Sequence, residues 1–547
     1  MASPTFAGLS GNKLSLAIST VATTGFLLFG SVISYQNANT VILLGIIDAD
    51  PFHAYFPETK NQTIQGLVTA IYEIGCLMGA MFILWIGDLL GRRRAMIMGG
   101  VIMIIGVIIQ VSAVKGYAQL AQFIVGRVVT GVGNGINTST IPTYQAECSK
   151  TSNRGLLICI EGGVIAFGTL IAYWVDYGAS YGPQDLTWRF PIAFQCIFGF
   201  VLCIAMIWLP ESPRWLLTHE RYEDAERVIA AIRGYEIDSD DTRRERDSVL
   251  DSIRASGFVG QKTTPIKALF TGGKTQHFRR MLLGSGSQFM QQVGGCNAVI
   301  YYFPILCTKI FGDKNLAMLL GGVNMIVYSI FATSSWFIIE RVGRRKLLLY
   351  GTAGQMFSMI LTFACLIPGG KHPEDTASSK GALVGLFTYI ASFGATWLPL
   401  PWLYPAEVNP LKTRGKANAV STCTNWLFNF LIVMVVPDMI KSLSWGTYLF
   451  FGVANACFFP ILYFFYPETA NRSLEEIDII FAKGYVEKIS YVKAAKELPF
   501  LTQAEVEQEA IRLGLVQSAS RGAMPEKPDA EDVRNDSGFN SDNSDKS

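Results

Sequence analysis

The sequence predicts an all-α membrane protein whose twelve transmembrane helices form two related six-helix halves. Three observations lead to this fold class. Half of the 547 residues are hydrophobic and only 16% are charged, whereas about a quarter of a soluble protein's residues carry charge. About a dozen apolar runs reach the roughly 20 residues that a helix needs to cross the hydrocarbon core. Motifs near the helix ends recur about 250 to 260 residues later.

The apolar runs give approximate span boundaries. The first half has spans at 15–36, 63–86, 95–114, 119–146, 155–177 and 190–209. The second half has spans at 281–307, 316–340, 346–367, 381–404, 414–436 and 446–466. The chain therefore divides into an N-terminal tail (1–14), a first half (15–209), a helical linker (210–280), a second half (281–466) and a C-terminal tail (467–547). The tail has amphipathic helical character over 474–515 and is expected to be disordered from about residue 518.

Lys and Arg orient the chain, because they gather in alternate short loops. The basic loop residues are Arg92–Arg94, Lys150, Arg154, Arg341, Arg344–Lys346, Lys412, Arg414 and Lys416. The positive-inside rule places these loops, the linker and both termini in the cytoplasm. The glycosylation motif at Asn61 then faces outward, close to the membrane.

The sequence does not support several other classes of protein. The net charge of +2 gives no sign of a nucleic-acid partner. The ten cysteines are scattered without a CxxC pair, so we expect neither a metal site nor disulfides, and no cofactor. Residues 1–13 are polar and the first apolar run is as long as a full span, so we expect no cleavable signal.

The internal repeat rests on three motif pairs. GRRR at 91–94 returns as GRRK at 343–346, YxAE at 144–147 with Arg154 returns as YxAE at 404–407 with Arg414, and PES at 210–212 returns as PET at 467–469. Carriers built from repeats place their binding site between the halves, near the middle of the membrane.

The same motifs put acidic and basic groups together at the cytoplasmic helix ends. We expect one ion-pair network in each half, formed by Asp88, Arg92, Arg93, Glu147, Arg154, Glu211 and Arg214, and by Glu340, Arg344, Arg345, Glu407, Arg414 and Glu468. Such a cytoplasmic latch would close the inner side while the site faces outward and open as the halves rock. The alternative is a set of basic loops that only fixes topology. Such loops need no acids at fixed spacing.

Further strings identify a resemblance. They are GRVVTGVGNG (126–135), PESPRWL (210–216), QQVGGCNAVIYY (291–302), ERVGRR (340–345), PWLYPAEV (401–408), NWLFNF (425–430) and PET…LEEI (467–477). Together they resemble the sugar porters of the major facilitator superfamily, in particular the fungal branch, which includes hexose, pentose, disaccharide and glycerol carriers. The resemblance implies the major facilitator fold, a plasma-membrane location and a functional monomer in the lipid bilayer.

The resemblance also implies alternating-access transport of a monosaccharide or small polyol by proton symport. Two alternatives stay open: a facilitative uniporter, and a non-transporting sugar sensor that signals through its C-terminal tail. An enzyme is not expected, because the sequence offers no Ser/His/Asp set and has four histidines, mostly in loops.

A sugar site needs groups that hydrogen-bond hydroxyls. The seventh span carries the amides of Gln291, Gln292 and Asn297, which both donate and accept, and polar groups inside spans usually face a cavity. The resemblance adds Asn324, Trp402, Asn425 and Trp426 to the sugar site, and Tyr301 and Tyr302 to its external closure. The alternative is that the amides bond between helices and the Trp residues mark the membrane interface.

Two carboxyl groups lie inside spans. Glu161 stands where many sugar porters that resemble this chain have Gln, so it is a candidate to bond hydroxyls, carry a proton, or both. Burial favours its neutral form, and the alternative is a neutral packing role. Glu73 in the second span is a further candidate.

The first span departs from the family pattern. After GFLLFG at 25–30 the family continues with Tyr-Asp-Gln-Gly, whose Asp works with the fourth-span Arg, here Arg127. This chain has no Asp between residue 31 and Asp48. Glu73 or Glu161 would then substitute as its partner. The alternative is that residues 31–45 come from a misplaced exon boundary, which sequencing the full-length transcript would decide.

Overall fold

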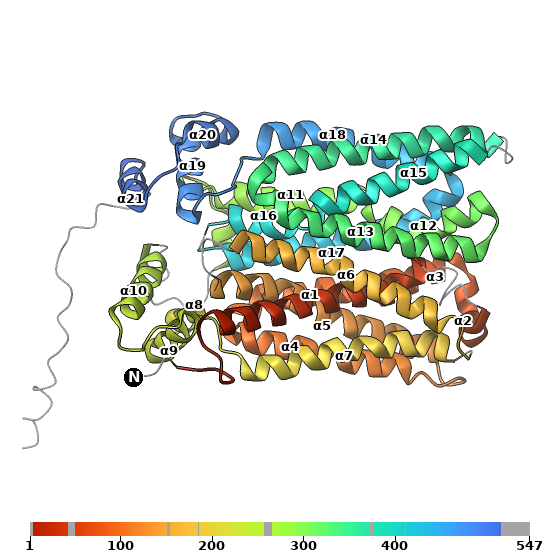
Figure 1. The fold of residues 1–547 in the computed structure, drawn as a ribbon, viewed down its shortest axis with the longest axis horizontal. Helices are drawn as coiled ribbons and strands as arrows, with labels where there is room; N and C mark the ends of the chain where they lie inside the picture. Colours follow the sequence, from red (N-terminus) through yellow and green to blue (C-terminus); the bar gives the residue numbers. More distant parts are fainter. Residues whose placement is uncertain are drawn as a thin grey trace, which may run out of the picture.

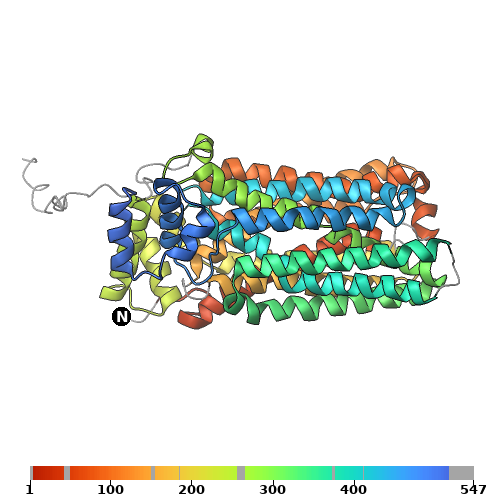
Figure 2. The same cartoon turned by 90° about the horizontal axis from the view of Figure 1, so that it is seen from above.

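The computed structural model describes residues 4–41, 50–149, 154–183, 185–255, 265–371, 376–410 and 412–515. Within these ranges, the side chains of Phe29, residues 31–41, Arg154, Tyr301 and Tyr302 are among those outside the description. The long helices form two bundles side by side, with α1–α7 in one and α11–α18 in the other (Figure 1). The short helices of the linker and the tail all lie at one end of the bundles (Figures 1 and 2).

Six long helices of the first bundle match the six predicted spans. They are α1 (Gly11–Val41), α3 (Gln62–Leu90), α4 (Arg92–Val111), α5 (Gln119–Cys148), α6 (Arg154–Ala179) and α7 (Leu186–Trp208). Two short helices, α2 (Asp50–Tyr55) and η1 (Pro57–Lys60), lie between α1 and α3. Within the described ranges, eight helical segments are long and apolar enough to span a membrane, and α5 is not among them because its buried face is rich in Gly, Asn and Thr residues.

The second bundle contains four continuous spans and two broken ones. The continuous helices are α13 (Lys314–Val342), α14 (Arg344–Lys371), α17 (Arg414–Ser442) and α18 (Gly446–Phe465). The seventh span is α11 (His277–Val293) followed by α12 (Cys296–Phe311), and the tenth is α15 (Thr376–Ser392), η4 (Phe393–Trp397) and α16 (Leu400–Val408). The twelve-span fold is therefore confirmed, but the sequence analysis treated these two spans as uninterrupted.

Glycine and proline explain both breaks. Gly295 adopts φ = 98°, a conformation open to glycine, and this ends α11 and starts α12 in a new direction. In the tenth span, Pro399 and Pro401 lack backbone N–H groups, so the regular helix gives way to a π-helical turn. All these residues lie in apolar stretches, so hydropathy alone does not reveal them.

Two helices of the first bundle approach each other closely through glycine. A Cβ atom at Gly75 would lie 2.3 Å from the carbonyl oxygen of Val128, and one at Gly135 would lie 2.0 Å from that of Cys76. Gly79 and Gly131 meet the facing backbone in the same way. Small residues four apart allow such contact between helices in lipid. The α3 and α5 backbones therefore touch, which brings the polar side chains of the two helices together.

We expect a Gly135→Ala variant to destabilise the protein by about 1 to 3 kcal/mol, because the added methyl group overpacks the α3–α5 contact. The measurement is the apparent thermal unfolding midpoint of detergent-purified protein. Gly178→Ala is the matched control, because a Cβ there meets nothing within 4 Å. Equal midpoints for the two variants would contradict the close packing.

The halves meet along two related interfaces. Helix α3 packs along α17, and α6 packs along α13. On α6, a Cβ at Gly162 would lie 2.8 Å from Cα of Pro399, and one at Gly163 would lie 2.4 Å from Nε1 of Trp336. Helix α6 of the first half thus packs directly against the broken tenth span.

The linker and the tail are helical where they are described. The linker contains α8 (Pro213–Thr218), α9 (Tyr222–Arg233), α10 (Asp240–Ala255) and η3 (Ile266–Phe270). The tail contains α19 (Leu474–Val486), α20 (Tyr491–Glu497) and α21 (Gln503–Arg512). Asp478 of α19 forms a 2.5 Å ion pair with Arg280 at the start of α11. The predicted disorder from residue 518 lies outside the described residues.

Candidate functional site

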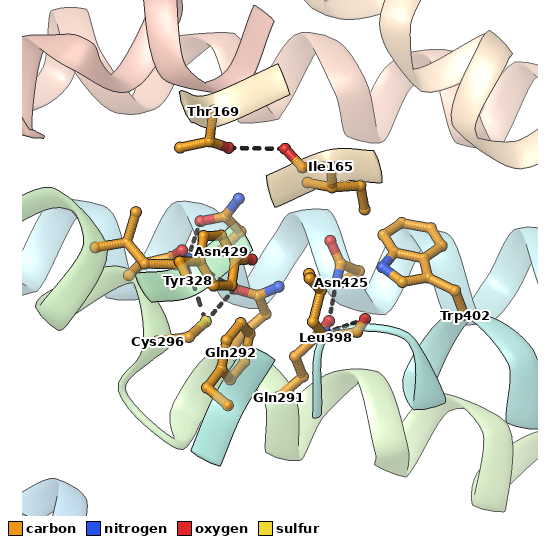
Figure 3. A pocket seen from close by; sticks show the side chains of 13 residues that line it. Ile165, Thr169, Gln291, Gln292, Cys296, Tyr328, Leu398, Trp402, Asn425 and Asn429 are labelled. Carbon is orange, nitrogen blue, oxygen red and sulfur yellow. Dashed lines mark hydrogen bonds between the residues drawn. The ribbon is translucent and has the colours of Figure 1, made fainter. Parts of the chain in front are cut away.

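A pocket of about 60 Å³ lies between the two bundles. Its lining residues are Ile165, Thr169, Gln291, Gln292, Cys296, Asn297, Ile300, Tyr328, Phe393, Leu398, Trp402, Asn425 and Asn429. The first half contributes Ile165 and Thr169 from α6, which face the amides of the second half in Figure 3. The lining combines amides, two hydroxyl groups and aromatic rings, and none of these thirteen residues carries a charge.

The break in the seventh span assembles three of these amides. In a straight helix, residues five apart point about 140° away from each other. Because the chain turns at Gly294 and Gly295, Nδ2 of Asn297 donates to Oε1 of Gln292 at 2.7 Å. The same Nδ2 donates to Oδ1 of Asn429 on α17 at 2.6 Å. Gln292 and Asn297 therefore share one pocket wall.

The break in the tenth span fixes two further glutamines. Pro401 and Pro405 have no N–H, so the carbonyls four residues earlier, on Trp397 and Pro401, lose their helical donors. Nε2 of Gln291 donates to the Trp397 carbonyl, and Nε2 of Gln288 donates to the Pro401 carbonyl, each at 2.7 Å. The side chains of α11 thus replace the missing backbone donors of α16.

Asn425 on α17 completes this amide network. Its Nδ2 donates to Oε1 of Gln288 at 2.6 Å and to Oε1 of Gln291 at 3.1 Å. Each of these amides has a defined orientation before any ligand binds, and this lowers the entropic cost of recognising hydroxyl groups.

The predicted sugar-site residues divide into three groups. Gln291, Gln292, Asn297, Trp402 and Asn425 line the pocket. Glu161, Asn324 and Trp426 are completely buried but do not line it. The side chains of Tyr301 and Tyr302 lie outside the described residues.

Sequence reasoning missed several lining residues. Asn429 could have been predicted from the sequence, because it follows Asn425 by four residues and so shares its helix face. Thr169, Tyr328 and Phe393 carry no comparable signal, since they resemble ordinary packing residues of a span. Phe393 enters the pocket through the π-helical turn.

A second polar cluster lies inside the first half, around Arg127 on α5. The Arg127 side chain is buried, and its Nη2 donates to the carbonyl of Thr69 on α3 at 2.8 Å. Glu73 stands one helical turn beyond Thr69, is also completely buried, and acts electrostatically on Arg127. Tyr72 and Cys76 flank Glu73 on α3. The glycine contacts between α3 and α5 bring these groups together.

The structure distinguishes the two candidate acids. Among the described residues, Glu161 is not one of the groups that interact electrostatically with Arg127. Neither of the Glu161 carboxylate oxygens has a hydrogen-bond partner among the described residues. Of the two carboxyl groups, Glu73 is therefore the one that stands with Arg127. The structure does not bring Glu161 to Arg127 or to the pocket.

The first of the two predicted ion-pair networks centres on Arg92. Its Nη2 lies 3.1 Å from Oε1 of Glu147, and its Nη1 lies 3.8 Å from Oδ1 of Asp88. Glu211 accepts hydrogen bonds from the backbone N–H groups of Arg92 and Arg93 at the N-terminus of α4, at 2.9 and 3.1 Å. A helix N-terminus favours such an anion. Burial raises the pKa of the Glu211 carboxyl, and these backbone N–H bonds oppose that rise.

The second network repeats the first, contact for contact. Arg344 pairs with Glu407 at 2.9 Å and with Glu340 at 2.7 Å. Glu468 accepts from the backbone N–H groups of Arg344 and Arg345 at 2.8 and 3.2 Å. The networks therefore share one design, although each lies within its own half.

This design explains the glycine that opens both GRR motifs. Gly91 and Gly343 have φ values of 85° and 98°. A Cβ at Gly91 would lie 2.6 Å from Oε2 of Glu211, and one at Gly343 would lie 2.5 Å from Oε2 of Glu468. Glycine leaves room for the carboxylate at the helix N-terminus.

Other predicted members of the networks have different partners. The Arg93 guanidinium donates to the carbonyl of Met206 at the end of α7, and that of Arg345 donates to the carbonyl of Tyr463 on α18. Arg414 donates to the carbonyl of Asn409 at 3.4 Å. Arg214 is partly buried in α8, and the side chain of Arg154 lies outside the described residues.

Three comparisons place the chain among known proteins. Residues 18–481 match the family model described as sugar (and other) transporter. Sugar transporter STL1 of Saccharomyces cerevisiae is 44% identical over 516 residues, covering 93% of this chain and 88% of the relative. Major facilitator superfamily transporter mfsA of Aspergillus fumigatus is 43% identical, covering 93% and 94% of the two chains.

Solved structures share the fold. The proton:xylose symporter XylE bound to 6-bromo-6-deoxy-D-glucose superposes with a TM-score of 0.72 at 23% identity, covering 85% of this chain and 99% of that one. The inward-open conformation of XylE from E. coli superposes with a TM-score of 0.63 at 24% identity.

Proposed function

Because the chain belongs to the sugar transporter family of the major facilitator superfamily, we propose that it carries a monosaccharide or small polyol by alternating access, coupled to proton entry. Sugar transport and an integral multi-pass membrane location follow from the family itself, and the chain is a transporter rather than an enzyme. The substrate class, the proton and the cellular membrane are the proposal.

The amide-lined pocket between the halves carries this proposal. Amides donate and accept at once, which suits the hydroxyl groups of a polyol. The aromatic rings of Tyr328, Phe393 and Trp402 offer faces for the C–H surface of a sugar ring. The lining residues include no charged group, and this favours a neutral polyhydroxy substrate over an amino acid or an organic acid.

The size of the pocket bears on the transport step. A cavity of about 60 Å³ is small beside the roughly 300 to 1,000 Å³ of ordinary small-molecule pockets. A monosaccharide therefore needs the halves to part before it can enter. A small polyol needs the least widening, so we expect polyols to compete effectively alongside hexoses and pentoses.

Arg127 and Glu73 support proton coupling. A buried carboxylate beside a buried guanidinium exchanges a proton when its surroundings change. We propose that Glu73 takes the role that the first-span Asp has in proton-coupled relatives. Glu161 then has a structural role in α6.

We also propose that the two cytoplasmic networks act as the latch. They join the inner ends of the spans within each half, so both halves present rigid inner ends to each other. The short helices of the linker and tail lie at this end (Figure 1). We place this end and both termini in the cytoplasm, and the protein, as a functional monomer, in the plasma membrane.

Uptake in a carrier-deficient host tests the function. Labelled glucose uptake is measured against a competition panel of hexoses, pentoses, disaccharides and glycerol. We expect uptake with alkalinisation of the medium. Uptake without alkalinisation would identify a uniporter, and absence of uptake of every panel member from a correctly localised protein would favour a sensor.

We expect Asn425→Ala to weaken the apparent affinity for the substrate about 5- to 150-fold, because the change removes two hydrogen bonds that orient Gln288 and Gln291. Loss of a buried partner costs about 1 to 3 kcal/mol. The measurement is KM for uptake. Asn418→Ala is the matched control, since Asn418 is buried on the same helix but does not line the pocket. Equal effects of both changes would contradict the site.

A further inference from the structure

Helix α17 contributes to the pocket lining, and one aromatic contact joins α17 to α3, the helix that carries Glu73. Tyr72 on α3 precedes Glu73 in the chain. Its ring meets that of Trp426 on α17 edge to face, with centroids 6.2 Å apart and an interplanar angle of 88°. Both rings are completely buried. Trp426 directly follows the pocket residue Asn425. This contact therefore crosses from the first half to the second, between the two candidate sites.

The first half holds Tyr72 firmly. Nδ2 of Asn134 on α5 donates to the Tyr72 hydroxyl oxygen at 2.6 Å. Asn134 stands two helical turns after Arg127 on the same helix, so one face of α5 contacts both the tyrosine and the acid pair. Because Tyr72 and Glu73 are neighbours on α3, a movement of Tyr72 also moves the helical turn that carries Glu73.

In the second half, α17 carries Trp426 on the other side of this ring contact. Asn425 donates to Gln288 and Gln291 on α11, whereas Trp426 faces α3. Neighbouring residues of a helix point about 100° apart, so α17 presents one side chain to each site. Movement of α17 relative to α3 changes the ring contact and the amide network together.

We propose that Tyr72 is the positioning residue that couples protonation of Glu73 to occupancy of the sugar pocket, through its contact with Trp426. The inference rests on the proposed symport. A symporter must make each ligand's affinity depend on the other, and this coupling is reciprocal. Such coupling needs an element that has two arrangements and touches both sites. The Tyr72–Trp426 contact joins α3 to α17 in this way.

The test uses the full chain in proteoliposomes and three measurements. They are accumulation of labelled substrate under an inward proton gradient, counterflow exchange without a gradient, and size-exclusion behaviour in detergent. One pH unit is worth about 1.4 kcal/mol and supports about tenfold accumulation by a 1:1 symporter. We expect Tyr72→Leu to reduce accumulation to about onefold while keeping at least half of the counterflow rate.

Two further variants distinguish positioning from packing. Tyr72→Phe keeps the ring and is expected to retain most of the accumulation. Phe167→Leu removes the equivalent contact at the other interface, where Phe167 on α6 and Trp336 on α13 have centroids 6.5 Å apart. This change is expected to leave the ratio of accumulation to counterflow unchanged.

The outcomes separate the two proposals. If the wild-type protein shows counterflow but no gradient-driven accumulation, the proposed symport is wrong and the Tyr72 inference falls with it. If the wild type accumulates and Tyr72→Leu accumulates equally well, only the inference is overturned. It is also overturned if Tyr72→Leu loses accumulation and counterflow in the same proportion, because the residue then serves packing alone.

Discussion

A Glu73→Gln variant is expected to lose gradient-driven accumulation of substrate, falling from about tenfold per pH unit to about onefold. Glutamine has the shape of the protonated acid but exchanges no proton, so the carrier cycles without a driving ion. Counterflow should persist, because the amides of the pocket are unchanged. The measurement is accumulation against counterflow in proteoliposomes at imposed pH gradients.

Glu161→Gln is the matched control for this prediction. Both acids are completely buried within spans, and both substitutions remove a carboxyl without changing volume. Glu161→Gln should keep gradient-driven accumulation, because Arg127 is acted on by Glu73 and not by Glu161 among the described residues. If the two variants behave in the reverse way, the proton site has been placed on the wrong acid.

Replacing Arg344 with Met is expected to have the largest effect on stability. Only 3% of the Arg344 side chain is exposed, and its guanidinium is shared between Glu407 and Glu340. Removing one partner of a buried ion pair leaves an uncompensated charge and costs about 3 to 5 kcal/mol. The measurement is the apparent unfolding midpoint and the monodisperse fraction after purification.

Two comparisons sharpen this prediction. Arg92 holds the corresponding place in the first half but is 13% exposed, so Arg92→Met should destabilise the protein less. Arg341 is exposed in the last turn of α13, three residues before Arg344, and Arg341→Met is expected to change stability by no more than about 0.5 kcal/mol. A midpoint for Arg344→Met close to that of Arg341→Met would contradict a structural role for the network.

The sequence alone predicted the fold class and named five of the thirteen residues that line the pocket. Long apolar runs have few alternatives in lipid, and recurring motifs mark the two halves. The amides Gln291, Gln292 and Asn297 were identified because polar side chains are rare in a span. Their mutual geometry was not predictable. It depends on a turn at Gly295 and on two prolines that lie inside apolar stretches.

The choice between Glu73 and Glu161 shows the same limit. Each is a carboxyl in a span, and composition treats them alike. What distinguishes them is which helix face meets α5, and that follows from the close glycine contacts between α3 and α5. The spacing of Gly75 and Gly79, and of Gly131 and Gly135, was readable in the sequence and would have indicated this pairing.

The bonds from Gln288 and Gln291 to the proline-freed carbonyls of the tenth span have a consequence for evolution and engineering. Both glutamines bond the backbone of another helix, and Gln291 also lines the pocket. Changing either one to alter substrate preference therefore also leaves a buried carbonyl without a donor. Gln292 and Asn429 bond only to other side chains in the described network. We expect substrate range to diversify through changes at Gln292 and Asn429. Gln288 and Gln291, which bond the carbonyls that proline leaves without a donor, should stay constant.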